Sequence, residues 1–284
     1  MRQSTWRWVR ERSWRWNWDW IFSTKFLLEG LSLLAGLATW YVVTDGLSLL
    51  PPTIFPGPTA VGKSILTLTT QGNLWGGTDY GPNIFGHALK TLQRLLIGYS
   101  LAVILGVALG VALGWSKWVE SILASYVDLV RPIPPISFIP LSIVWFGFSL
   151  TQKVFLVFLG GFWPILLNTR GGVKGVSADL VRAGLMLGMN RREILYKIVL
   201  PAALPDILTG AKLAVGTSSI AVFGAELAGA QDGLAWLTIQ AANFLRPPDI
   251  ITGIIFIGLI GLTVAAAFTQ LERKLLRWYY LKGL

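Results

Sequence analysis

The sequence predicts an all-α, polytopic membrane protein with about six transmembrane helices, and two observations support this. Of its 284 residues, 54% are hydrophobic and only 13% are charged, whereas soluble domains average roughly 25% charged residues. Apolar runs of the length that a helix needs to cross a bilayer recur along the chain. The chain has no cysteine and one histidine, which excludes a thiolate metal site or a disulfide framework. We therefore expect no catalytic site and no enzyme activity in this chain.

Six apolar runs are the candidate spans. They cover residues 21–43, 95–115, 119–146, 153–168, 207–227 and 250–268. The second and sixth runs are apolar almost throughout. The third is interrupted by prolines, and its boundary with the fourth, near residues 147–152, is the least defined.

The distribution of lysine and arginine predicts the orientation, because short cytoplasmic loops carry an excess of both. If both termini lie on one side, that side collects most of the basic residues. The opposite side then holds Lys63, Lys90, Arg94, Lys153 and Arg246. We therefore predict a multi-pass protein of the cytoplasmic (inner) membrane with both termini cytoplasmic and the segment 44–93 external.

The first twenty residues are rich in tryptophan and arginine, and no small-residue cleavage site follows the first apolar run, so they are not typical of a cleavable signal. Alternating arginine and aromatic residues can bind single-stranded nucleic acid. Directly before a spanning helix, however, tryptophan and arginine favour an interfacial anchor. We predict a cytoplasmic interfacial segment over 1–20, a transmembrane domain over 21–284, and no nucleic-acid partner.

The stretch FPGPTAVGKS, residues 55–64, matches the phosphate-loop pattern G-x-x-x-x-G-K-[ST] through Gly57, Gly62, Lys63 and Ser64. A phosphate loop follows a buried strand and opens a helix. The preceding residues, LSLLPPTIFP, contain three prolines and do not resemble a strand. The predicted external side also holds no ATP. We interpret the stretch as a Pro/Gly turn that leads into an external amphipathic helix, against a nucleotide site as the alternative.

A cytoplasmic loop over about 170–206 has the pattern of two short helices. Ser177 can cap the first helix, Gly188 permits a sharp turn, and Asn190 can cap the second. Pro201 and Pro205 are expected to end the second helix. Basic residues and exposed apolar side chains make this loop a candidate docking site for a partner, and an amphipathic loop lying on the bilayer is the alternative.

This loop resembles the coupling motif of binding-protein-dependent ABC importer permeases, E-A-A-x3-G-x9-I-x-L-P. Gly188, Ile198, Leu200 and Pro201 occupy the specified positions, whereas Arg182, Ala183 and Gly184 stand where Glu-Ala-Ala would be. Three further stretches resemble the nitrate, taurine, sulfonate and bicarbonate branch of this family: FPGPTAV, RPIPPISFIPLSIVWFG and GAELAGAQDGLAWLTIQAA. The resemblance runs from about residue 55 to the C-terminus.

The resemblance implies a type I ABC importer permease-like fold and a set of partners. A homodimer or pseudo-dimer of permeases would form the pore. Cytoplasmic ATPase subunits would bind ATP and Mg and hydrolyse the ATP, and an external binding protein would deliver the solute. The ATPase-coupling residues would then be those of the motif: Arg182, Ala183, Gly184, Gly188, Ile198, Leu200 and Pro201. This chain would bind no cofactor itself, and the solute class would be taurine or other sulfonates, nitrate, bicarbonate or a vitamin precursor.

Polar residues inside spans often face a cavity. The candidate path residues are Arg131, Thr217, Ser218, Ser219 and Glu226. Arg131 would attract an anion, or instead pair structurally with Asp128 or Glu226, or extend to the interface. Glu226 would repel an anion, which favours a structural or gating role.

Glycines at every fourth position, Gly106, Gly110 and Gly114, predict close helix packing.

An ion-coupled secondary transporter of small anions is the alternative function. It predicts inverted internal repeats, which the sequence does not show.

Overall fold

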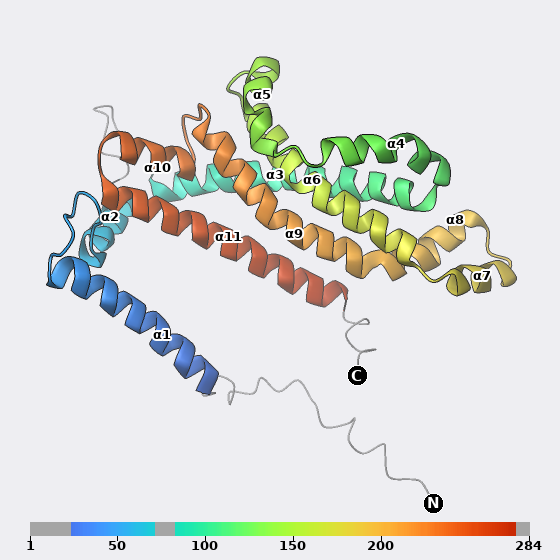
Figure 1. The fold of residues 1–284 in the computed structure, drawn as a ribbon, viewed down its shortest axis with the longest axis horizontal. Helices are drawn as coiled ribbons and strands as arrows, with labels where there is room; N and C mark the ends of the chain where they lie inside the picture. Colours follow the sequence, from blue (N-terminus) through green and yellow to red (C-terminus); the bar gives the residue numbers. More distant parts are fainter. Residues whose placement is uncertain (1–23, 72–82, 277–284) are drawn as a thin grey trace, which may run out of the picture. The chain divides into compact units, whose positions relative to one another are not determined.

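The computed structural model describes residues 24–71 and 83–276, and these ranges contain helices and turns without a strand (Figure 1). The chain divides into two units between Lys63 and Ser64, so each unit is described by itself. The Trp/Arg-rich segment 1–20 and the predicted domain boundary after it lie outside the described residues, and both stay predictions.

In the first unit, helix α1 (Thr24–Tyr41) continues into a short π-helix, η2 (Val42–Gly46), and a turn then leads to α2 (Pro58–Thr70). The turn is held by side chains of the first unit. The indole of Trp40 donates to the carbonyl of Pro56 at 3.1 Å, and the Asp45 carboxylate accepts from the amide of Thr59 at 3.1 Å. Proline is favoured in the first turn of a helix, where its missing N–H has no intrahelical partner. The predicted Pro/Gly turn and the helix after it are confirmed.

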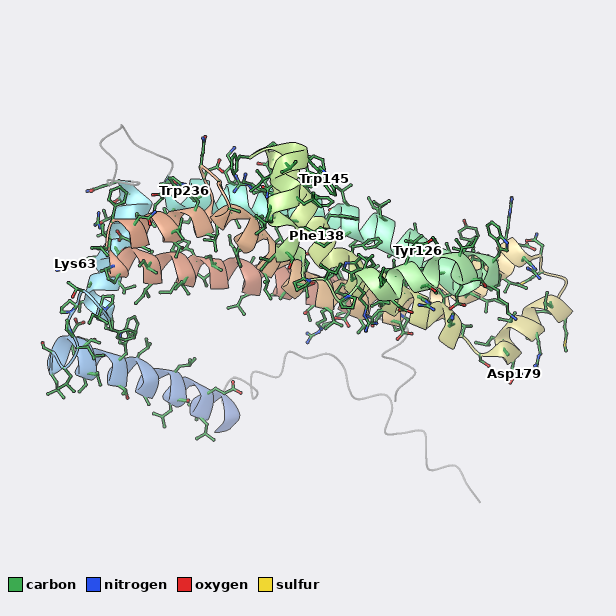
Figure 2. The ribbon with its side chains drawn as sticks, turned by 45° about the horizontal axis from the view of Figure 1, so that its top comes forward. Lys63, Tyr126, Phe138, Trp145, Asp179 and Trp236 are labelled. Atoms are coloured by element: carbon green, nitrogen blue, oxygen red, sulfur yellow. The ribbon has the colours of Figure 1, made fainter. Side chains whose placement is uncertain are left out.

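This geometry excludes a phosphate loop at residues 55–64. Lys63 lies in the body of α2 (Figure 2), so the amides around it are engaged in the helix rather than open to a ligand. The carboxylate of Asp45 already occupies the helix N-terminus and would repel a phosphate. The hydroxyl of Ser64 donates to Asp249 at 2.5 Å, so it serves a structural contact rather than a metal.

The second unit is built on four long helices: α3 (Ile84–Trp115), α6 (Leu150–Gly175), α9 (Leu200–Leu227) and α11 (Pro247–Leu275). Helix α6 packs along both α3 and α9, and α11 packs on α9. Two short helices, α7 (Ala178–Met186) and α8 (Arg191–Ile194), lie at one end of this unit, and α10 (Leu234–Asn243) lies at the other (Figure 1). We refer to these as the α7–α8 end and the α10 end.

The glycine stripe of α3 is the contact surface for α6. A Cβ at Gly106 would lie 3.0 Å from Cγ2 of Ile165, and one at Gly110 would lie 2.6 Å from Cβ of Thr169. Gly114 meets α6 in the same way one turn further on. The predicted close packing is confirmed, since any side chain at these positions would separate the two backbones.

Five described helices are long and apolar enough to cross a membrane, or six if one bent pair counts as a span. The bent pair is α4 (Lys117–Val130) with the segment 135–146, made of the 3₁₀-helix η3 (Pro135–Phe138) and α5 (Ile139–Phe146), at an angle of 89°. The prolines between α4 and η3 explain the bend, because proline lacks a donor and disfavours helix in the preceding residue. The predicted third span is therefore two short helices rather than one straight helix.

The prediction that Pro201 and Pro205 end the second loop helix is wrong. From Arg191 the chain runs through α8, a π-helix, η4 (Leu195–Val199), and α9 to Leu227 as one span of 37 residues. Pro201 lies in the first turn of α9, directly after the wider π turn. A π segment loosens the hydrogen-bond ladder at that point, so the missing N–H and the ring of the proline are accommodated without a break.

Candidate coupling site and solute path

The two-helix loop at the α7–α8 end has the capped geometry that its sequence predicts. Ser177 caps α7 by accepting from the amide of Asp179 at 3.3 Å. Gly188 follows with φ of +78°, a backbone region that residues with a Cβ rarely adopt. Asn190 and Glu193 then form a capping box at α8, each side chain accepting from the other residue's amide, at 2.9 and 3.0 Å. The sharp turn is therefore fixed at both of its ends.

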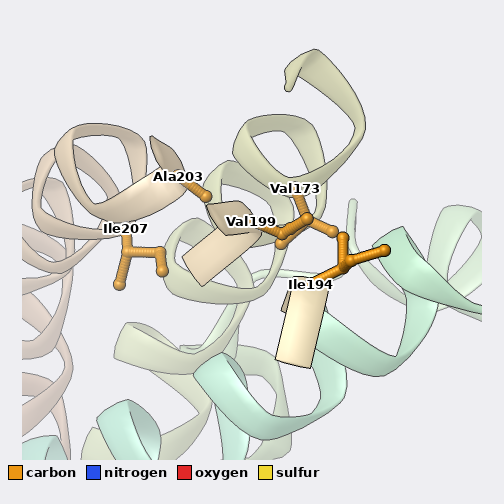
Figure 3. Packing of buried hydrophobic residues seen from close by; sticks show 5 residues of the cluster. All are labelled: Val173, Ile194, Val199, Ala203 and Ile207. Carbon is orange, nitrogen blue, oxygen red and sulfur yellow. The ribbon is translucent and has the colours of Figure 1, made fainter. Parts of the chain in front are cut away.

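A small apolar core holds this loop on the long helices (Figure 3). It consists of buried side chains from α6, α8, η4 and α9: Val173, Ile194, Val199, Ala203 and Ile207. Because α8 continues into α9 without a break, the loop is joined directly to a helix long and apolar enough to span a membrane.

Gly184 explains one departure from the coupling motif. A Cβ at Gly184 would lie 2.6 Å from Cδ1 of Ile198 and 3.3 Å from Cγ1 of Ile194. The alanine of the motif would therefore require Ile198 to move. In this chain Gly184 and Ile198 are paired packing residues that bring α7 close to η4.

The outer surface of the loop combines apolar side chains with charge. Met186 is 86% exposed and Leu187 is 79% exposed. Arg182, which stands at the acidic position of the motif, is exposed and lies 3.3 Å from Asp179. Large apolar side chains at the tip of a charged loop are typical of a surface that contacts another protein.

The predicted coupling residues fall into two groups. Four of them are exposed, namely Arg182, Ala183, Gly188 and Pro201. The other three are buried or half-buried, namely Gly184, Ile198 and Leu200. The structure thus brings all seven together in one loop. Their role in coupling stays a prediction, with contact expected for the exposed group and support of the loop for the other.

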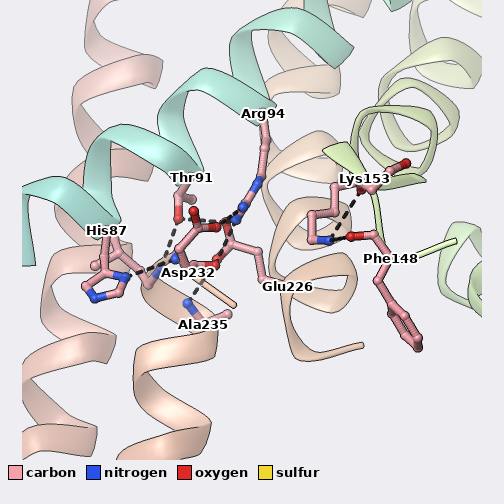
Figure 4. A network of polar contacts seen from close by, with 11 residues as sticks. His87, Thr91, Arg94, Phe148, Lys153, Glu226, Asp232 and Ala235 are labelled. Atoms are coloured by element: carbon pink, nitrogen blue, oxygen red, sulfur yellow. Dashed lines mark hydrogen bonds and ion pairs between the residues drawn. The ribbon is translucent and has the colours of Figure 1, made fainter. Parts of the chain in front are cut away.

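Glu226 lies at the centre of a buried polar network near the α10 end (Figure 4). Its side chain is fully buried, and Oε1 accepts from Thr91 at 2.7 Å and from Arg94 at 2.8 Å. Oε2 accepts from the amide of Ala235 at 3.1 Å. Arg94 also contacts the carboxylate of Asp232 and donates to its carbonyl at 2.9 Å. A buried carboxylate requires such partners, because an unpaired charge in the interior is costly.

The same network fixes the connection between α9 and α10. The amide of Gly233 donates to Nδ1 of His87 at 3.0 Å, and the amide of Leu234 donates to Thr91 at 2.9 Å. Gly233 has φ of +110°, and a Cβ there would collide with the carboxyl group of Glu226. The first turn of α10 is therefore tied to α3 and to the end of α9.

Arg131 and Glu226 are not brought together. Glu226 pairs with Arg94, so the alternative in which it pairs with Arg131 is wrong. Arg131 is exposed at the C-terminus of α4, and within the part of the chain that the structure describes it forms no ion pair, with Asp128 or any other carboxylate. Its role in a solute path stays a prediction.

The three predicted hydroxyls of α9 face different surroundings. Ser218 is fully buried and donates to the carbonyl of Val157 in α6 at 3.3 Å, which places it in a helix–helix contact. Ser219 donates within its own helix to Val215 at 2.8 Å. Thr217 is exposed. Of the three, Thr217 is the one exposed at the surface of this chain, and the role of all three in a solute path stays a prediction.

Sequence reasoning missed the partners of Glu226. The sequence does not predict that Arg94 lies between Glu226 and Asp232, although it contains one indication of a cation near Glu226. A glutamate near the end of an apolar helix requires a cation, and Arg94 stands directly before the most apolar run of the chain.

Comparisons with known proteins agree with this geometry. Residues 102–278 match the family described as binding-protein-dependent transport system inner membrane component. The taurine transport system permease protein TauC of Escherichia coli (strain K12) is 32% identical over 265 residues, covering 93% of this chain and 94% of TauC. The bicarbonate transport system permease protein CmpB of Synechococcus elongatus is 31% identical over 259 residues, covering 88% of this chain and 91% of CmpB.

A solved structure shares the fold. The MetNI methionine ABC transporter in inward-facing conformations aligns with a TM-score of 0.55 and 18% identity, covering 68% of this chain and 95% of the matched chain. This likeness supports the fold, and the predicted all-α, type I importer permease-like class is confirmed. The chain belongs to the family of binding-protein-dependent transport system inner membrane components, the permease subunits of ABC importers.

Proposed function

We propose that this chain is the transmembrane subunit through which an ATP-driven importer moves a small anionic solute of the sulfonate, nitrate or bicarbonate class. Relatives that match nearly the whole chain are named for taurine, aliphatic sulfonates and bicarbonate. These solutes are small anions or carry an anionic group, which supports the solute class.

The loop around Gly188 carries the proposal. Its capped turn, its exposed Met186 and Leu187 and its continuity with α9 suit a site where ATPase subunits dock. ATP and Mg would bind in those subunits, and this chain would supply the path. In this arrangement the closure of the ATPases moves α9 through the short α8 and η4 segments.

The proposed orientation places the α7–α8 end and both termini in the cytoplasm. The basic residues Arg170, Lys174, Arg191 and Arg192 gather at or beside the α7–α8 end, as the positive-inside rule requires of the cytoplasmic side. The α10 end then faces outward, where a solute-binding protein would dock.

Two permease chains, identical or closely related, would enclose the path. An exposed strip of α9 includes Thr209, Gly216 and Thr217. Small and hydroxyl side chains on one helix face permit close approach of a second helix or of a polar solute. The candidate residue Thr217 would be reached from this side.

The decisive test is Gly188→Val in the assembled transporter. Valine at a φ of +78° is strained, so the turn would reshape. We expect the ATPase subunits to dissociate during purification and solute uptake to fall at least tenfold. Gly171→Ala is the matched control, because a Cβ there meets open space.

Unchanged uptake together with unchanged ATPase association in Gly188→Val would refute the coupling role. Uptake by this chain in vesicles without any ATPase subunit would instead favour an ion-coupled transporter.

A further inference from the structure

A polar cavity lies beside the Glu226 network and serves no part of the coupling loop. It has a volume of about 330 Å³ and is lined by α3, by the first residues of α6 and by the connection between α9 and α10. Its polar lining consists of Lys90, Gln93, Arg94, Lys153, Gln231 and Asp232. Ligand pockets in proteins start at about 300 Å³, so this cavity suits a small solute.

Lys153 is the unusual member of the lining. Its side chain is almost fully buried, at 3% exposure for the residue, and its Nζ donates to the carbonyls of Phe148 at 3.1 Å and Ser149 at 3.4 Å (Figure 4). An ammonium group has three donors, so one N–H remains. In the described ranges of the chain no carboxylate lies within 4.0 Å of this ammonium group. A buried ammonium that is hydrogen-bonded only to neutral carbonyl groups, with no carboxylate in direct contact, is costly.

Arg94 also has unused donor capacity. Its terminal nitrogens contact Glu226 and Asp232, but its buried Nε has no hydrogen-bond partner among the described residues. The cavity lining therefore carries three cationic side chains, Lys90, Arg94 and Lys153, against the single carboxylate of Asp232. Even with Glu226 counted behind Arg94, positive charge is in excess.

We propose that this cavity binds the anionic group of the transported solute, a sulfonate, carboxylate or comparable small oxyanion, at the α10 end of the permease. Lys153 supplies a buried donor and Lys90 an exposed one, while Arg94 contributes charge. The permease itself would then select its solute, rather than accept whatever the binding protein delivers. This inference rests on the proposed function, because it assumes that the α10 end receives the solute.

Direct binding tests the proposal. The permease–ATPase complex, reconstituted in nanodiscs without the external binding protein, is titrated with taurine, ethanesulfonate, nitrate and bicarbonate. We expect saturable binding of at least one of these probes. Lys153→Met and Lys90→Gln should each weaken it by roughly tenfold or more, the scale of one lost charge-assisted hydrogen bond. Lys63→Gln, an exposed lysine outside the cavity lining, is the matched control and should bind normally.

The outcomes separate this inference from the proposed function. No saturable binding of any probe, with normal ATP-driven uptake once the binding protein is added, would overturn the cavity site and leave the importer intact. Probe binding that Lys90→Gln leaves unchanged would also overturn the cavity site. If Lys153→Met does not assemble, the binding measured with Lys90→Gln, a change at an exposed position, decides between the outcomes. If the unmodified complex binds the probes but shows no ATP-driven uptake after the binding protein is added, the result would count against the proposed function alone.

Discussion

Replacing Arg94 with methionine should destabilise the protein strongly, because it leaves Glu226 buried without a cation. The carboxylate of Glu226 is fully buried and would keep only Thr91 and the amide of Ala235 as donors. Breaking a buried ion pair by removing one partner costs about 3–5 kcal/mol. For a domain of this size, each kcal/mol lowers the thermal midpoint by roughly 2–4 °C, so we expect a decrease of at least about 6 °C.

The assay is thermal unfolding of the purified transporter complex, followed by intrinsic tryptophan fluorescence at one fixed scan rate. Adding Glu226→Gln to Arg94→Met removes the orphaned charge and should recover more than half of the loss. Arg170→Met is the control. Its pair with Glu120 is partly exposed, and Glu120 retains Lys174, so the thermal midpoint should change little. An unchanged midpoint in Arg94→Met, or no recovery in the double variant, would refute the reasoning.

Three further predictions concern other parts of the chain. Gly110→Ala places a Cβ against Thr169 and should lower the thermal midpoint, whereas Gly171→Ala meets open space and should leave the midpoint unchanged or raise it. Asn190→Ala removes the capping box and should cost about 1 kcal/mol, visible as faster amide hydrogen exchange over 191–194; unchanged exchange would contradict the role of the cap. Lys63→Ala should leave the nucleotide affinity and ATPase rate of the complex unchanged, and a decrease in either would revive the phosphate-loop interpretation.

Features that depend on local chemistry could be predicted from the sequence. The Ser177 and Asn190 caps, the turn at Gly188 and the glycine stripe of α3 follow from side-chain preferences within a few residues. The lengths of the apolar runs indicated the spanning helices in the same way. The position of the proposed coupling loop in the chain therefore follows from its own residues.

Features that depend on contacts between residues far apart in the sequence could not be predicted from it. Arg94 meets Glu226 from 132 positions away, and spacing alone does not reveal that contact. Pro201 is tolerated because of a π turn, which has no simple sequence signature. The cavity around Lys153 is formed by three separate segments, so neither its lining nor its excess of positive charge is visible in any single stretch.

The most direct test of the coupling claim uses the absence of cysteine from this chain. Met186→Cys on the coupling loop and Leu245→Cys at the α10 end replace equally exposed side chains, at 86% each. A short thiol–amine cross-linker is applied to each variant in the assembled transporter. We expect Met186→Cys to cross-link to the ATPase subunit, with ATP changing the yield, and Leu245→Cys to give no such product. Cross-linking to the ATPase from position 245, or none from position 186, would contradict the assignment of this loop as the coupling site.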